Sequence, residues 1–230
     1  MTKKITSDSS KRGHRQLHVK VKTAKGRKKS STQWLQRQLN DPYVLLANKE
    51  GYRSRAAFKL IEMDDRFHFL QPNMKVVDLG AAPGGWTQVA VKRAQKGKVV
   101  GLDLQEMEPI SGATLLQLDF SEDEAVDVLS EHIGEGKVDV VLSDMAASSC
   151  GHAPTDHLRI VMLCELAFDF AEKYLAEGGT FVAKILRGGT ERELLIKMKR
   201  CFKTVKHVKP EASRKDSAEM YVIATGFKAQ

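Results

Sequence analysis

A single lysine interrupts the apolar stretch TFVAKILRGG at residues 180–189. A buried ammonium group is costly unless it is paired or loses its proton. We therefore expect Lys184 to lie late in a strand and to point from the strand end into a cleft. A neutral lysine can take a proton from a weakly acidic hydroxyl group, and both partial burial and a neighbouring cation favour the neutral form. The residue and its setting predict a base.

Three carboxylates stand at the ends of other apolar stretches, namely Asp103, Asp119 and Asp144. Asp103 could hold the two hydroxyl groups of a ribose, and Asp119 could accept a hydrogen bond from an adenine amino group. Asp144 should reach the same rim as Lys184. Each aspartate alone is more typical of a loop or a helix cap, but together they favour a ligand that contains adenosine, bound at the carboxyl ends of a parallel sheet.

A glycine-rich turn, VVDLGAAPGGW at residues 76–86, joins a predicted strand to a predicted helix. Gly80, Gly84 and Gly85 would let a ligand approach the backbone, although helix–strand packing alone also explains such glycines. The spacing departs from GxGxxG, and Pro83 stiffens the turn. An adenosine site without a diphosphate cradle favours S-adenosylmethionine over NAD. The chain has no GxxxxGK[ST] sequence, which excludes a P-loop kinase.

Alternating strand and helix patterns place these residues. Predicted strands lie at 75–79, 98–104, 113–119, 138–143, 179–186, 203–209 and 219–226, and predicted helices at 32–40, 43–49, 85–96, 121–133, 156–177 and 190–202, with a further helix around residues 57–63. Apolar strands separated by helices indicate a mostly parallel sheet covered on both faces. No helix separates the last two strands, so we expect the final one to run antiparallel. The fold class is α/β, a doubly wound seven-stranded sheet.

Positive charge is concentrated at the N-terminus. Residues 1–30 contain eleven Lys/Arg and one acid, a net charge of +10, whereas the whole chain carries +8. This segment is nearly free of large apolar side chains, so we predict a disordered basic arm at 1–30 and one folded domain at 31–230. Such an arm suits binding to a polyanion by counterion release. A merely solubilising tail is the alternative.

Other features bound the function by what they lack. The three cysteines form no CxxC pair, no apolar run approaches the length of a membrane span, and the N-terminus has no apolar signal core, so we expect a cytoplasmic protein with no membrane partner. The basic start also has some features of a mitochondrial transit peptide, but without an amphipathic apolar stripe. The seven histidines show no ligand spacing, so no metal is expected. Cys150 lacks the preceding proline of a cytosine-C5 nucleophile.

Five segments, taken in order, resemble the FtsJ/RrmJ (RlmE) family of ribosomal RNA 2′-O-ribose methyltransferases. They are RSRAAFKL (53–60), VVDLGAAPGGW (76–86), SDMA (143–146), FVAK (181–184) and SAEMYVIATGF (217–227). The resemblance spans about residues 32–228. It implies a Rossmann-like, S-adenosylmethionine-dependent methyltransferase domain at 31–230 and a catalytic tetrad of Lys59, Asp144, Lys184 and Glu219.

The resemblance also implies a role for each tetrad member. Lys184 would act on the ribose hydroxyl, and Asp144 would orient it near the methionine moiety. Lys59 would help to keep Lys184 neutral and position the target, and Glu219 would hold Lys59 or the ribose. The expected cofactor-binding set comprises Gly80, Gly84, Trp86, Asp103, Asp119 and Asp144.

The family resemblance implies a substrate as well: a uridine ribose in the peptidyl-transferase A-loop of large-subunit ribosomal RNA, modified on the assembled subunit without an obligatory protein partner. The chain departs from the family pattern at 147–151, where relatives have proline after SDMA, and at 185–187, where Ile-Leu-Arg replaces the usual Phe-Gln run. Both departures concern target contacts. Alternatives are the same chemistry on transfer RNA or an mRNA cap, a non-catalytic RNA-binding assembly factor, and a nicotinamide oxidoreductase.

Overall fold

The computed structural model describes residues 19–21, 26, 28–147, 150–187 and 192–229. The chain divides into two compact units, Met1–Leu45 and Leu46–Gln230, and each is described by itself. Most of the predicted arm at 1–30 lies outside the described residues, so its disorder stays a prediction. Unit 1 contains helix α1 (Lys29–Leu39) and the first part of helix α2 (Pro42–Glu50).

Within unit 1, residues 19–21 are held by the amide side chains of Gln36 in α1 and of Asn40, the residue that follows α1. Asn40 Oδ1 accepts a 2.8 Å hydrogen bond from the backbone N–H of Val19, and Asn40 Nδ2 donates to the Val19 carbonyl at 2.9 Å. Gln36 likewise accepts from the N–H of Val21 at 3.0 Å and donates to the Val19 carbonyl. Residues 19–21 of the basic segment are therefore hydrogen-bonded to the helix that follows the segment and to its C-cap.

Unit 2 is built on a seven-stranded sheet. Its strands are β1 (Lys75–Leu79), β2 (Lys98–Asp103), β3 (Ala113–Gln117), β4 (Val138–Ser143), β5 (Leu175–Leu186), β6 (Phe202–Val208) and β7 (Glu219–Phe227). Their spatial order is β3-β2-β1-β4-β5-β7-β6. Strands β1 to β5 pair in parallel, and β7 is antiparallel to both of its neighbours. The predicted doubly wound sheet with an antiparallel last strand is confirmed.

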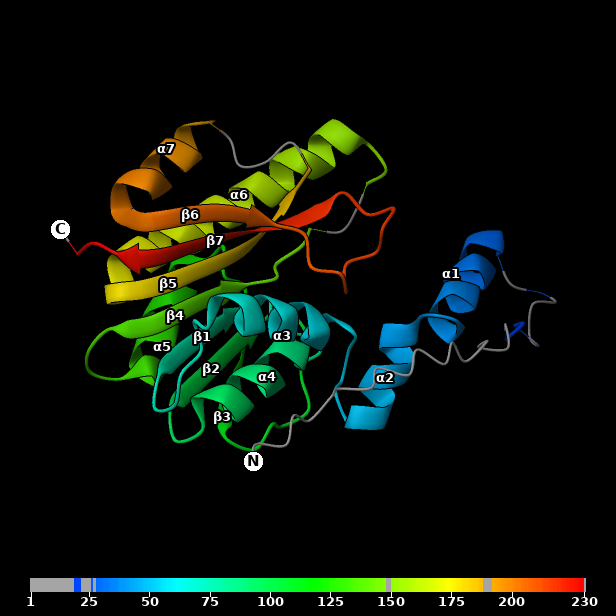
Figure 1. Ribbon diagram of the computed structural model, residues 1–230, viewed down its shortest axis with the longest axis horizontal. Coiled ribbons are helices and arrows are strands. Elements are labelled where there is room, and N and C mark those ends of the chain that lie inside the picture. Colours follow the sequence, from blue (N-terminus) through cyan, green and yellow to red (C-terminus); the bar gives the residue numbers. More distant parts are fainter. Residues whose placement is uncertain (1–18, 22–25, 27, 148–149, 188–191, 230) are drawn as a thin grey trace, which may run out of the picture. The chain divides into compact units, whose positions relative to one another are not determined.

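Helices cover both faces of this sheet (Figure 1). One face carries α3 (Ala56–Phe67) and α4 (Gly85–Ala94), and the other carries α5 (Asp123–Ile133), α6 (Ala153–Tyr174) and α7 (Arg192–Cys201). Adjacent strand residues go to opposite layers: Val76 packs in the α3–α4 core and Val77 in the α5–α7 core. This is why the central strands are continuously apolar.

The same alternation explains how a lysine fits in β5. Val182 belongs to the α3–α4 core, whereas Ala183 and Ile185 belong to the opposite core. Lys184, two residues after Val182, therefore continues the α3–α4 face at the carboxyl end of the strand. Across the ladder it stands directly opposite Tyr221 of β7.

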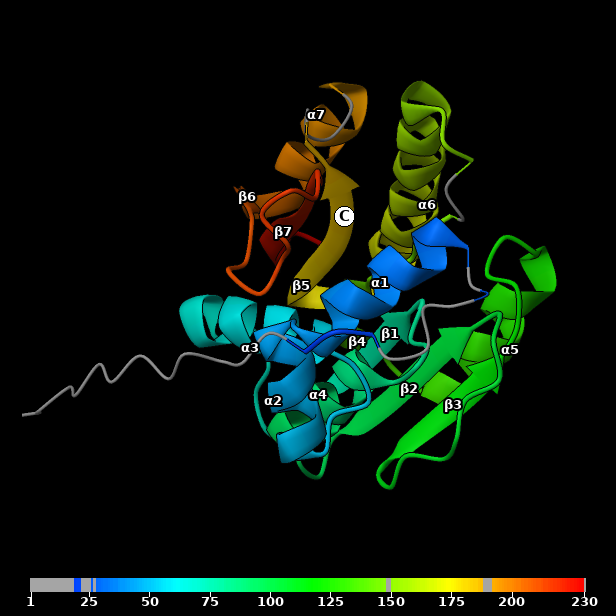
Figure 2. The same ribbon diagram turned by 90° about the vertical axis from the view of Figure 1, so that its right-hand side faces the viewer.

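Figure 2 shows the sheet twisted between its two helical layers. In the part of the chain that the structure describes, no helix is long and apolar enough to cross a membrane.

Candidate active site

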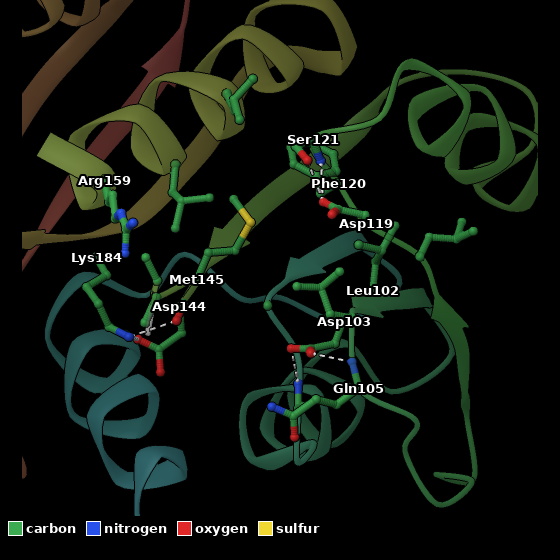
Figure 3. A pocket seen from close by; sticks show the side chains of 18 of the residues that line it. Leu102, Asp103, Gln105, Asp119, Phe120, Ser121, Asp144, Met145, Arg159 and Lys184 are labelled. Carbon is green, nitrogen blue, oxygen red and sulfur yellow. Dashed lines mark hydrogen bonds and ion pairs between the residues drawn. The ribbon is translucent and has the colours of Figure 1, made fainter. Parts of the chain in front are cut away.

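A pocket of about 650 Å³ opens where β1 to β5 reach their carboxyl ends. Each strand contributes a polar or small residue to its wall: Gly80 after β1, Asp103 at the end of β2, Asp119 after β3, Asp144 after β4 and Lys184 in β5. Figure 3 shows the carboxylates and the lysine converging on the pocket from different strands. This is the edge of the sheet at which the sequence predicted a ligand.

Lys184 and Asp144 are in direct contact. The Lys184 Nζ atom lies 2.9 Å from Asp144 Oδ1 and donates a 2.7 Å hydrogen bond to the backbone carbonyl oxygen of Asp144. The two side chains are only 10% and 16% exposed, respectively. The ammonium that seemed out of place in an apolar strand is thus paired and oriented by the residue that follows the neighbouring strand β4.

A second cation–carboxylate pair lies close by. Lys59, on α3, places its Nζ atom 2.6 Å from Glu219 Oε1 at the start of β7. These side chains are also largely shielded, at 11% and 17% exposure. The two pairs bring together residues from four separate parts of the chain, and these are the four members of the predicted tetrad.

Tyr221 joins the two pairs. Its hydroxyl donates a 2.8 Å hydrogen bond to Asp144 Oδ1 and accepts a 3.2 Å hydrogen bond from Lys59 Nζ. Tyr221 is fully buried, and its ring lies 5.5 Å from that of Trp86. A continuous chain of polar contacts therefore runs from Lys184 through Asp144 and Tyr221 to Lys59.

The charges of this cluster set the protonation states of Asp144 and Tyr221. Burial alone would raise the pKa of Asp144, but the ammonium groups of Lys184 and Lys59 and the hydrogen bonds from Lys184 and Tyr221 outweigh it and hold that pKa below its usual value. Burial, together with the negative charges of Asp144 and Glu219, raises the pKa of Tyr221 well above its ordinary value. At neutral pH, Asp144 is therefore a carboxylate and Tyr221 a hydrogen-bond donor.

Two further carboxylates shape the other end of the pocket. Backbone N–H groups hold Asp103: Ala82 donates to Oδ2 and Gln105 donates to Oδ1, each at 2.9 Å. Ser121 holds Asp119 through its N–H at 2.9 Å and its hydroxyl at 2.6 Å, and these bonds lower the pKa of Asp119. Each carboxylate oxygen has more than one lone pair, so both aspartates keep capacity to accept hydrogen bonds from a ligand.

The glycines of the turn are required by protein packing. A Cβ atom on Gly80 would lie 2.7 Å from the Met145 Cα atom, so this glycine lets the segments after β1 and β4 approach each other beside the pocket. Gly84 has φ +110°, and a Cβ atom there would lie 2.6 Å from Ile110 Cδ1. Gly84 is absent from the residues that line the pocket in the described part of the chain, so its contact with a cofactor stays a prediction.

Trp86 has a supporting position in the described structure. It is buried, and its indole N–H donates a 2.8 Å hydrogen bond to the backbone carbonyl of Ala56 at the start of α3. With its ring against Tyr221, it ties α4 to α3 and to the polar cluster. A direct contact with a cofactor stays a prediction for this residue as well.

Sequence reasoning did not find Tyr221 or Arg159. Tyr221 is two residues after Glu219 in a strand, so the two side chains lie on the same face of the sheet. This spacing is the one signal that places Tyr221 beside Glu219. Arg159, an exposed residue of α6, lines the pocket and lies near Lys184 in Figure 3. No local pattern distinguishes it from other surface arginines.

Comparisons with known proteins identify a family. A family model described as FtsJ-like methyltransferase matches residues 52–227. Two curated relatives named ribosomal RNA large subunit methyltransferase E are each 60% identical to the chain. The one from Parvibaculum lavamentivorans aligns over 229 residues, 95% of this chain and 90% of its own, and the one from Roseobacter denitrificans over 240 residues, 100% of both.

A crystal structure supports the same relationship. A Plasmodium falciparum protein assigned as a ribosomal RNA methyltransferase superposes with a TM-score of 0.68 at 33% identity, covering 76% of this chain and 98% of its own. The matched residues 52–227 contain all the strands and every member of the cluster described above. The chain belongs to the FtsJ-like methyltransferase family.

Proposed function

We propose that the protein transfers a methyl group from S-adenosylmethionine to the 2′-hydroxyl of a uridine ribose in large-subunit ribosomal RNA, on the assembled subunit and in the cytoplasm. The names of the two 60%-identical relatives support the class of substrate. The observation that carries the chemistry is the Lys184–Asp144 contact of 2.9 Å on the pocket wall, linked through Tyr221 to Lys59. Such a cluster suits deprotonation of a hydroxyl group.

The pocket fits the proposed cofactor by its donors and acceptors. Asp103 is fixed by two backbone N–H groups and would hold the ribose hydroxyls, and Asp119 would accept from the adenine amino group. Exposed Leu104 adds an apolar side chain to the pocket lining. Asp144 supplies negative charge at the opposite end. When bound, S-adenosylmethionine supplies an electrophilic methyl group on a sulfonium ion.

The residues of the chain then divide the work on the substrate. Lys184, in its amine form, takes the proton from the 2′-hydroxyl group, and Asp144 fixes the direction of the Lys184 Nζ atom. Lys59 holds the target ribose, while Glu219 holds Lys59. A base of this kind contributes about 10²- to 10⁴-fold to the rate, and positioning supplies much of the remainder.

The test is transfer of labelled methyl from S-adenosylmethionine to large subunits purified from a strain that lacks this protein, followed by mapping of the modified nucleotide. We expect one labelled 2′-O-methyl uridine in the large-subunit RNA. Label in transfer RNA would make transfer RNA the substrate. Label at a base amino group would make a base, and not a ribose, the methyl acceptor. No label in any RNA fraction would leave a non-catalytic RNA-binding role.

A further inference from the structure

The loop between β6 and β7, residues 209–218, reaches the polar cluster from a side that the reaction scheme above does not use. The Ser213 hydroxyl donates a 3.0 Å hydrogen bond to Glu219 Oε1. The same carboxylate oxygen lies 2.6 Å from Lys59 Nζ. Ser213 is only 4% exposed, so its hydroxyl is shielded from a substrate.

Helix α3 holds this loop in place through the residue next to Ser213. The Arg55 guanidinium donates a hydrogen bond to the backbone carbonyl of Ala212, and the N–H of Ala212 donates a 2.9 Å hydrogen bond to Glu62 Oε2. Arg55 and Glu62 stand four residues before and three residues after Lys59, so all three share one face of the helix. The helix that carries Lys59 thus also fixes the backbone from which Ser213 reaches Glu219.

The loop is further closed on itself. Lys209 Nζ donates to the backbone carbonyls of Ser217 and Lys215, at 2.7 and 3.2 Å, and the N–H of Glu219 donates a 3.1 Å hydrogen bond to the Ser217 hydroxyl. These bonds fix both ends of the loop and the backbone of Glu219. The hydrogen bond from Ser213 fixes the side chain of Glu219, which has three rotatable bonds to restrain.

We propose that Ser213 is a positioning residue for the Glu219–Lys59 pair, and that the β6–β7 loop is a built part of the active site. A donor on Glu219 Oε1 selects one rotamer of the carboxylate, and that rotamer sets where the Lys59 ammonium lies relative to Tyr221. Loss of the hydroxyl frees the carboxylate to rotate, and Lys59 is then held less well against the target ribose. This inference rests on the proposed function, because it is read out through methyl transfer.

The experiment is a double-mutant cycle of Ser213→Ala and Glu219→Ala, measured as kcat and KM for large subunits and for S-adenosylmethionine. We expect Ser213→Ala to lower kcat/KM for the RNA substrate about 5- to 20-fold, because Glu219 loses one hydrogen bond that orients its carboxylate, and to leave the KM for S-adenosylmethionine within about twofold. In the Glu219→Ala background the same change should cost less than about twofold, because no carboxylate remains to be held.

Two comparisons separate positioning from packing. Ser130→Ala removes a hydroxyl that donates to the backbone carbonyl of Asp127 in α5, away from the polar cluster, and it should leave all rates unchanged. Ser213→Thr and Ser213→Val have the same shape and differ in the hydroxyl, so Thr should retain activity that Val loses. This pair also decides the question if Ser213→Ala fails to fold.

The outcomes distinguish the inference from the proposed function. Equal losses in Ser213→Thr and Ser213→Val, or additive losses in the cycle, would overturn the positioning role even though the wild-type protein methylates the subunit. Absence of methyl transfer by the wild-type protein would instead overturn the proposed function.

Discussion

Tyr221 and Lys184 meet at one atom. The Tyr221 hydroxyl lies 2.8 Å and the Lys184 Nζ atom 2.9 Å from the same oxygen, Asp144 Oδ1. The two residues are also directly opposite each other in the β5–β7 ladder, so their shared acceptor follows from strand register. Asp144 is thereby held as a carboxylate from two sides, and the amine that we propose as the base is aimed by it.

Removal of the Tyr221 hydroxyl should raise the pKa of Asp144. The hydrogen bond from Tyr221 is one of the interactions that lower that pKa, so Tyr221→Phe raises it. We expect the titration of the Asp144 carboxyl group, followed by carbon NMR, to move to higher pH, and kcat at neutral pH to fall about 5- to 20-fold because Lys184 is aimed less well. Coincident titrations of Asp144 in the two proteins would contradict the role given to Tyr221.

From the burial of Asp78 we predict that the free energy of unfolding depends on pH, independently of catalysis. This β1 residue is completely buried with a hydrogen bond from Thr87 at 2.6 Å, and burial is the main cause that raises its pKa to about 7. The folded chain therefore binds this proton more tightly than the unfolded chain. Its contribution to stability is complete below the unfolded pKa of about 4 and is lost as the pH rises to about 7.

Asp78→Asn should remove that pH dependence. Between pH 5 and pH 8 we expect the free energy of unfolding of the wild-type protein to fall by about 2 to 3 kcal/mol more than that of the variant. Urea unfolding at the two pH values measures this difference, and any fixed cost of the buried amide cancels in the comparison. Parallel pH dependences of the two proteins would show that Asp78 does not titrate in this range.

Gly80 should tolerate no side chain. Gly80→Ala adds a Cβ atom 2.7 Å from the Met145 Cα atom to a backbone at φ +75°, whereas Gly178→Ala adds one at φ +81° with no atom within 4 Å. The control measures the cost of backbone conformation, about 1 kcal/mol, and Gly80→Ala should cost about 1 to 3 kcal/mol more. Urea unfolding compares the two variants. Equal costs would mean that the approach of the Met145 backbone to Gly80 contributes little.

The basic N-terminus should act through charge. Deletion of residues 1–28 removes ten Lys/Arg, and we expect weaker binding to large subunits with a shallower dependence of log K on log salt, by about 0.7 to 0.9 for each lost phosphate contact. A variant with the same ten residues replaced by glutamine keeps the length and should behave like the deletion. An unchanged salt slope in both would leave the segment a solubilising tail.

Much of the fold was predictable because buried parallel strands are continuous apolar runs. Six strand predictions agree with the structure within two residues at each end, whereas β5 begins at Leu175, four residues earlier than expected. Its first part contains Glu177, Gly178 and Gly179, which are typical of a turn. Leu175 pairs with Val138 and Thr180 with Val140, so residues 176–179 fall in the register shift between these two pairs. The turn-like residues therefore form an irregularity in the strand instead of preceding it.

The site was predictable where a polar residue ends an apolar strand. Lys184 and Asp144 stand out for that reason, and the structure brings them together. Tyr221 does not stand out, because a buried aromatic residue in a strand is typical of a core. Ser213 does not either, because its role depends on how a loop folds back onto α3, which no local pattern encodes.

The central claim is that Lys184 takes the proton from the substrate hydroxyl, and one measurement tests it most directly: single-turnover methyl transfer to large subunits by Lys184→Ala, alongside its affinity for S-adenosylmethionine. With the exposed Lys96→Ala as a matched control, we predict a Kd for S-adenosylmethionine within about threefold of wild type and a rate at least about 100-fold lower. A variant that binds the cofactor and transfers methyl at the wild-type rate would contradict the account.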